Sequence, residues 1–163
     1  MDLIKDKQAS IESLPLKLII VCIITSISVP TVWSAFSNYS RIQSENSIRA
    51  EIFSMISAVK QVYICSNGTS TKTEISLKDI DYLQIGDRVE SENASVIQYK
   101  LRGCAGEEKI IISEPTIRIT SPENTATIIR DGRYTLLLTH INYDKNKDGT
   151  VSKNERYVEI RIL

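Results

Sequence analysis

Nineteen consecutive residues, 18–36, carry no charge, and this stretch limits the fold more than any other feature. At about 1.5 Å per residue, a helix of that length comes close to crossing a bilayer core of about 30 Å. Isoleucine, valine and leucine fall on every side of such a helix, which excludes an amphipathic surface helix. The core helix of a soluble protein is the remaining alternative, and such helices are usually shorter. We therefore expect a membrane-spanning helix over residues 14–36.

A cleaved secretory signal would be built differently. Its apolar core has about 7–15 residues and is followed at once by a cleavage site of small residues. Here the apolar run is longer, and the sequence S-N-Y-S-R follows it in a continuing helical pattern. We expect the apolar segment to be kept, and the 163 residues then leave room for one ordinary domain beside it.

A short motif stands just before the apolar run, where Gln8, Ser10, Glu12 and Leu16 fit the pattern Q-x-S-x-E-x-x-x-L. A lone carboxylate at the edge of an apolar segment is costly unless it meets a cation. Without the rest of the motif, Glu12 could be an interfacial carboxylate among lipid headgroups, and Ser10 could be an ordinary helix cap. With this motif directly upstream of an apolar helix, the chain resembles the methanogen-type precursors of archaeal type IV pilins.

The resemblance implies a processing step and an assembly. In that family a membrane aspartyl peptidase, the prepilin peptidase, cuts on the amino side of the glutamine. Residues 1–7 would be the leader, and the mature chain would begin at Gln8. The family usually has Gly or Ala before the cut, whereas this chain has Lys7. Before assembly, membrane lipid would surround the helix. In the filament, identical subunits would pack around it, and Glu12 would pair with the α-amine that cleavage creates on Gln8 of a neighbouring subunit.

The pattern changes after the membrane run to one apolar stripe at steps of three and four residues, which predicts an amphipathic helix over 37–65. The sequence S-N-G at 66–68 supplies the residues that end a helix. A single helix over 8–66 is therefore expected, with bends at Pro15 and Pro30. The stripe consists of Ile48, Ile52, Met55, Ile56, Val59, Val62 and Tyr63.

Residues 67–163 have the composition of a β-sheet domain. Segments 95–101, 109–113, 116–120 and 156–163 are rich in isoleucine and valine. The dipeptide Asp131-Gly132 separates two further strand-like runs, 125–130 and 133–138, and predicts a hairpin between them. We expect an α+β fold of the type IV pilin kind, with an antiparallel sheet head packed on the helical stripe.

Residues 144–155 match the calcium-loop pattern D-x-[DN]-x-[DN]-G-x5-E at every constrained position. Strand-like sequences flank this segment, so we expect a structural calcium clip and not a switch between paired helices. A polar turn that merely contains acids is the alternative. The oxygen ligands would come from alternate positions of the loop and from a bidentate glutamate at its end. They are Asp144, Asn146, Asp148, Thr150, Ser152 and Glu155.

Two cysteines and three glycosylation sequons are interpreted with the head expected on the outside of the cell. A disulfide between Cys65 and Cys104 is expected in an oxidising compartment. Glycosylation sequons occur at Asn38, Asn67 and Asn93.

No arrangement of residues indicates an enzyme. The chain has no G-x-S-x-G, no P-loop and no C-x-x-C, and its one histidine, His140, lies in a strand-like run. Lys plus Arg and Asp plus Glu are both 20, so no basic excess favours nucleic acid. We expect a subunit of an archaeal type IV pilus-like surface filament, held in the cell membrane as a precursor. The alternatives are a single-pass anchored calcium-binding surface domain and a pseudopilin-like accessory of a secretion or adhesion machine.

Overall fold

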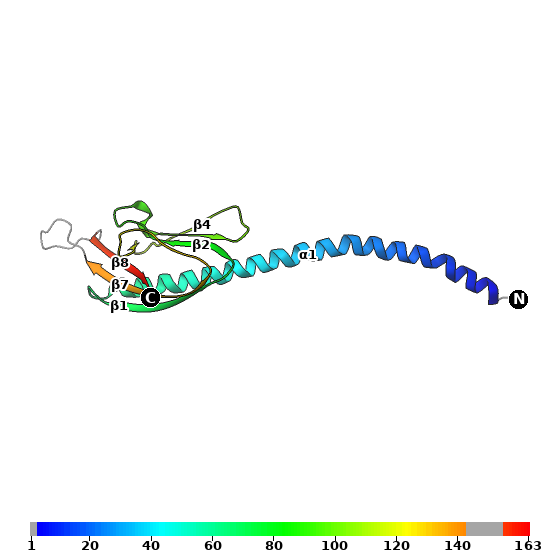
Figure 1. The fold of residues 1–163 in the computed structure, drawn as a ribbon, viewed down its shortest axis with the longest axis horizontal. Helices are drawn as coiled ribbons and strands as arrows, with labels where there is room; N and C mark the ends of the chain where they lie inside the picture. Colours follow the sequence, from blue (N-terminus) through cyan, green and yellow to red (C-terminus); the bar gives the residue numbers. More distant parts are fainter. Residues whose placement is uncertain (1–2, 143–154) are drawn as a thin grey trace. The chain divides into compact units, whose positions relative to one another are not determined.

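The computed structural model describes residues 3–142 and 155–163, and the side chains of residues 15–142 and 155–163. The chain divides into two compact units, Met1–Gln43 and Ser44–Leu163. One long N-terminal helix and a set of mostly antiparallel strands confirm the α+β architecture (Figure 1). The elements are α1 (Leu3–Ile64), β1 (Ser70–Leu77), β2 (Ile80–Ile85), η1 (Glu92–Ser95), β3 (Val96–Leu101), β4 (Glu108–Ile111), β5 (Arg118–Thr120), β6 (Thr127–Ile129), β7 (Gly132–Asn142) and β8 (Arg156–Ile162).

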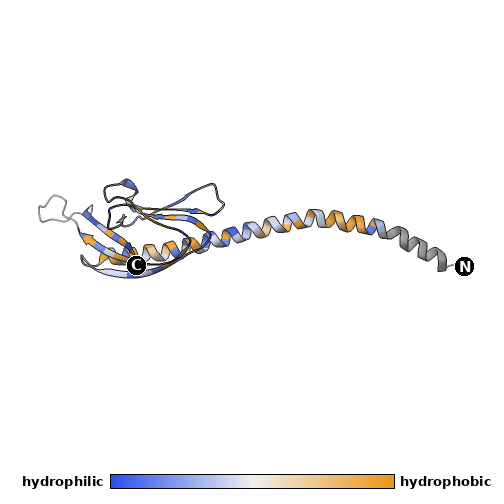
Figure 2. Ribbon diagram, viewed as in Figure 1, coloured by the Kyte–Doolittle hydropathy of each residue, from blue (hydrophilic) through white to orange (hydrophobic). Residues whose placement is uncertain are grey.

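The first unit consists of the N-terminal part of α1, which continues through Pro15 and Pro30. An 18-residue window of this helix has a mean hydropathy of 2.0 and none of it is buried, so the helix is long and apolar enough to cross a membrane. Figure 2 shows the apolar residues concentrated there. The hydroxyl groups of Thr25, Ser26 and Thr31 each donate to the backbone carbonyl four residues earlier. These polar groups are therefore satisfied inside the helix and add little cost to an apolar environment.

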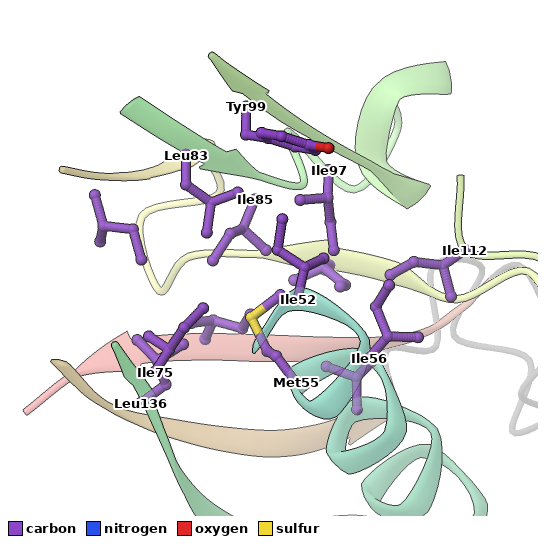
Figure 3. Close-up of a cluster of buried hydrophobic side chains, with 14 of the residues drawn as sticks. Ile52, Met55, Ile56, Ile75, Leu83, Ile85, Ile97, Tyr99, Ile112 and Leu136 are labelled. Carbon is purple, nitrogen blue, oxygen red and sulfur yellow. The ribbon is translucent and has the colours of Figure 1, made fainter. Parts of the chain in front are cut away.

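The described strands of the second unit form two four-stranded sheets, with the orders β1-β7-β8-β5 and β4-β3-β2-β6. All pairs are antiparallel except β5 with β8, which is parallel. The helical stripe predicted from spacing is confirmed, because Ile52 and Val59 are fully buried. In Figure 3 the α1 side chains Ile52, Met55 and Ile56 meet side chains from both sheets.

The predicted hairpin at Asp131-Gly132 is wrong. β6 pairs with β2, whereas β7 pairs with β1 and β8, so the dipeptide carries the chain from one sheet to the other. The Asp131 carboxylate accepts a hydrogen bond from the backbone N–H of Ile80 at 2.8 Å and pairs with Arg102. Asp131 thus links the turn by a hydrogen bond to the start of β2 and by an ion pair to the residue after β3. A turn sequence specifies a local reversal, but it does not specify which strands meet afterwards.

Candidate functional site

The predicted processing motif lies on α1. The backbone is helical at Lys7, Gln8, Ser10 and Glu12, whose side chains lie outside the described residues. Leu16, the last motif position, is described and is exposed. The motif therefore lies on the helix, and the pairing of Glu12 with the α-amine of a neighbouring subunit remains a prediction.

The apolar surface after the motif is uncovered in the structure. Trp33 is 74% exposed, and Phe36 and Tyr39 are each 65% exposed. The sequence between Lys17 and Arg41 contains no charged residue. Aromatic side chains with this placement are typical of the interface between a bilayer and water. Such a surface is compatible with membrane association.

The predicted calcium loop connects two neighbouring strands. Its residues 144–154 lie outside the described part of the chain, whereas its last ligand, Glu155, is described and is buried. β7 and β8 pair antiparallel up to Asn142 and Arg156, which confirms that strands and not helices flank the loop. Among the described residues no group of three His, Cys, Asp or Glu side chains could hold a metal ion. Glu155 is the one predicted ligand that the structure describes, and it lies at the base of the β7–β8 connection.

The base of this connection is bonded to the end of α1 and the segment after it. His140 Nδ1 lies 2.8 Å from the carbonyl oxygen of Cys65, and the backbone N–H of Asn142 donates to Asn67 Oδ1 at 2.8 Å. The His140 ring is buried and tilted against Tyr63, with 5.4 Å between ring centroids. The bond to a carbonyl assigns the proton to Nδ1. His140 therefore has a structural role here, in joining β7 to the helix end.

The predicted disulfide between Cys65 and Cys104 is not formed within the chain, and both thiols are free. Cys104 follows Arg102, whose backbone N–H donates to the carbonyl oxygen of Asp79 at 2.9 Å. The Asp79 carboxylate in turn accepts a hydrogen bond from Ser44. Cys65 lies 21 residues beyond Ser44, or about 30 Å along the helix. A disulfide needs Cα atoms within about 7 Å, and sequence alone does not show that the two cysteines lie at opposite ends of the head.

The three sequons lie in different settings. Asn38 is in the middle of α1, Asn67 is in the turn after it and Asn93 is in η1, and all three side chains are exposed. Asn67 uses its side-chain oxygen to accept the bond from Asn142, and a glycan on the amide nitrogen would leave that oxygen in place. The structure is therefore compatible with modification at Asn67.

The outward face of α1 in the second unit was not recognised as a separate feature from the sequence. The charged residues that border this face make contacts with other residues of the second unit. Arg49 pairs with Glu45 at 3.1 Å and Glu108 at 3.3 Å, and its pKa is raised by Tyr99 first and by these carboxylates. Lys60 donates to the carbonyl oxygen of Ser113 at 3.2 Å. What remains exposed is an uncharged line that we call the outer seam. It consists of Asn46, Ala50, Phe53, Ser57, Gln61 and Ile64.

The signal that could have revealed the outer seam is a line of uncharged residues at steps of three and four, opposite the apolar stripe.

The long N-terminal apolar helix followed by a β-sheet head is compatible with a pilin-like fold. Comparison with protein-family models, with curated proteins and with solved structures finds no match to this chain in any of the three.

Proposed function

We propose that this chain is a structural subunit of an archaeal type IV pilus-like surface filament, which polymerises through its apolar N-terminal helix. The observation that carries the proposal is the uncovered apolar surface of α1, of which none is buried in the most apolar window. Burial of apolar surface stabilises by about 25 cal/mol per Å², so this surface favours either lipid or neighbouring helices. Lipid covers it in the membrane-held precursor, and the helices of other subunits replace the lipid on assembly.

The motif before the helix supplies the step between these two states. Prepilin peptidase would release the chain at Gln8 and create an α-amine with a reference pKa of about 8, which is mostly protonated at neutral pH. Glu12 of one subunit would pair with that amine on its neighbour. Removal of one partner from a pair inside an apolar bundle costs about 3–5 kcal/mol, so the pair would also set the register of the subunits.

Calcium has a supporting role in this proposal. The ion would bind the loop at 144–155 through hard oxygen ligands and so hold β7 and β8 together where they leave the sheet. The loop lysines Lys145, Lys147 and Lys153 would weaken binding, which suits surroundings rich in calcium. The head would thus be stabilised outside the cell.

The first experiment is to map the N-terminus of the native protein in membranes and in sheared surface filaments. A start at Gln8 in the filaments is the expected result. A cleaved chain that stays out of filaments would indicate a pseudopilin-like accessory. A start at Met1 throughout would contradict the filament proposal and indicate a single-pass anchored calcium-binding surface domain.

The mutation Glu12→Leu tests the assembly step itself. We expect the variant to fold and insert, because a leucine is compatible with the apolar segment, and to lose filaments because the amine has no partner. Filament mass after shearing and the membrane-bound pool are the two measurements. Glu123→Leu, at an exposed position of the head, is the control and should assemble normally. A normal filament yield from Glu12→Leu would remove the proposed role of this carboxylate.

A further inference from the structure

The turn that follows α1 contains the one Asn-Gly pair of the sequence, Asn67-Gly68. Glycine has no side chain to shield its backbone nitrogen, so that nitrogen can approach the side-chain amide of the preceding asparagine closely. Both residues are exposed, and Gly68 has φ +82° with nothing within 4 Å of its Cβ position. The pair is therefore accessible to water, and the contacts that it makes in the folded head decide whether it reacts.

The reaction that an Asn-Gly pair favours is deamidation. The Gly68 backbone nitrogen attacks Asn67 Cγ, the new C–N bond closes a five-membered succinimide ring, and the Cγ–Nδ2 bond breaks. Nδ2 leaves as ammonia and takes up the proton that the Gly68 nitrogen gives up. Water then opens the ring at one of its two carbonyl carbons, which gives aspartate or isoaspartate. Solvent water is the co-reactant, and no atom is oxidised or reduced.

Three hydrogen bonds hold the reacting groups in place in the folded head. The Gly68 N–H donates to the carbonyl oxygen of His140 at 2.8 Å, and this bond engages the proton that must leave. Asn67 Oδ1 accepts from the Asn142 backbone N–H at 2.8 Å, and this bond fixes the side-chain amide. The His140 backbone N–H donates in turn to the carbonyl oxygen of Thr69 at 2.9 Å. Ring closure requires the first two of these bonds to be released.

A fourth hydrogen bond supports the same contact from outside the reacting pair. His140 Nδ1 lies 2.8 Å from the carbonyl oxygen of Cys65, and the buried His140 ring is tilted against Tyr63. We call these four hydrogen bonds, between residues 65–69 and the end of β7, the α1–β7 junction. Contacts of this kind open locally at a free energy below that of global unfolding. The rate at Asn67 should therefore follow the open fraction of the junction.

We infer that Asn67 is a site of spontaneous deamidation, and that the α1–β7 junction holds the reaction back while the head is folded. The inference concerns the chemical lifetime of the head and depends neither on filament formation nor on calcium. Aspartate at this position keeps an oxygen that accepts from Asn142, so this product leaves the junction closed. Isoaspartate places an extra methylene in the main chain before Gly68, so this product displaces the N–H that donates to His140.

Peptide mapping of the full chain by mass spectrometry tests the inference. The chain is produced in a host without N-glycosylation, because a sugar on Nδ2 would change the leaving group. In guanidinium chloride at neutral pH, Asn67 should deamidate first among the asparagines and give both aspartate and isoaspartate. Asn93, which precedes Ala94, is the internal control and should react more slowly.

The folded chain in detergent at the same pH provides the comparison. The rate at Asn67 should be lower than in guanidinium chloride by at least roughly tenfold, since only the open fraction of the junction reacts. An unreacted Asn67 in the denatured chain would overturn the inference, because the pair would then not be a site. Equal rates in the two states would overturn it as well, because the folded contacts would then hold nothing back.

The variant His140→Ala tests whether the junction is the barrier. It removes the bond to the Cys65 carbonyl and leaves the reacting pair unchanged. Deamidation should become about fivefold faster, the factor that corresponds to a hydrogen bond of about 1 kcal/mol. Tyr134→Phe is the matched control, because it removes a side-chain hydrogen bond at the other end of β7, and its rate should stay that of the unaltered chain.

Thermal unfolding shows whether both variants are folded. A folded His140→Ala chain that deamidates at the rate of the unaltered chain would contradict the role of the junction. If His140→Ala does not fold, the comparison of the folded and denatured unaltered chain still decides the inference.

Discussion

Gly86 and Asp87 form the turn after β2, where the chain passes close to β5. The Gly86 backbone has φ +63°, a left-handed conformation that side chains rarely adopt. A Cβ atom at this position would lie 2.0 Å from the carbonyl oxygen of Ile119. The Asp87 N–H donates to that same oxygen at 3.1 Å, so the carbonyl is held in place. Neither the backbone conformation nor the space at Gly86 allows a side chain.

Gly86→Ala should therefore destabilise the head by about 2 kcal/mol or more, because the backbone strain and the clash act together. Gly106→Ala is the matched control, since nothing lies within 4 Å of its Cβ position. Its effect should stay within about 0.5 kcal/mol. Thermal unfolding of the full chain measures both variants, and equal stability of the two would contradict this account of the turn.

Asp87 should make the stability of the head depend on pH. Its carboxylate accepts a hydrogen bond from the Ser91 hydroxyl at 2.7 Å and one from the Arg88 backbone N–H at 2.8 Å, and these bonds lower its pKa from the ordinary 3.8. A lowered pKa means that the stabilisation is complete above that ordinary value and is lost as the pH falls through the folded value. Asp87→Asn should cost about 1 kcal/mol at neutral pH and should flatten the acid limb of the unfolding profile.

Ser91→Ala is the companion variant, because it removes the largest cause of the lowered pKa and leaves the carboxylate in place. The loss of stability of this variant at acid pH should be intermediate between the losses of the unaltered chain and of Asp87→Asn. An equal fall in stability for all three proteins between neutral pH and the acid range would show that Asp87 contributes nothing to acid stability.

The helix α1 presents two different faces within one turn of its second half. Ile52 is fully buried between the two sheets, and its neighbour Phe53 is 53% exposed on the outer seam. The face that a residue occupies, and not its hydrophobicity, decides what it contributes to the fold.

The adjacent positions provide a test of this difference. Ile52→Ala should lower the free energy of unfolding by about 2–5 kcal/mol, because it leaves a cavity in the core. Phe53→Ala should change it by about 0.5 kcal/mol or less, because little buried area is lost. Chemical denaturation measures both. A large loss from Phe53→Ala in an unassociated chain would show that this side chain belongs to the core.

For the whole molecule, calcium is expected to stabilise the head if the loop at 144–155 binds it. A ligand that binds only the folded state at about 100 times its Kd adds about 2.7 kcal/mol, so a chelator should lower the Tm of the chain. Asp148→Asn should weaken this response, because a ligand loses its charge. Lys147→Gln is the control at a non-ligand position and should keep the response. A Tm unaffected by chelator in the unaltered chain would contradict the calcium site.

Much of this fold could be predicted from sequence because its signals are local. The long apolar helix, the buried stripe from Ile48 to Val62 and the positions of β3, β4, β5 and β8 all follow from spacing within a few turns or a few residues. The apolar run that carries the proposed function is also visible in the sequence of residues 18–36, whereas its exposure comes from the structure. For the calcium loop, the sequence predicted the strand character of both flanks, and the structure agrees.

Only the tertiary structure decided how these elements meet. The hairpin at Asp131-Gly132 is replaced by a crossing between sheets, β5 pairs in parallel with β8, and Cys65 and Cys104 are held at opposite ends of the head. The contacts that draw charge away from the outer seam, such as Arg49 with Glu108, join residues 59 positions apart. Such pairings depend on which strand edges and side chains meet once the chain closes on its core, and local periodicity holds no information about that choice.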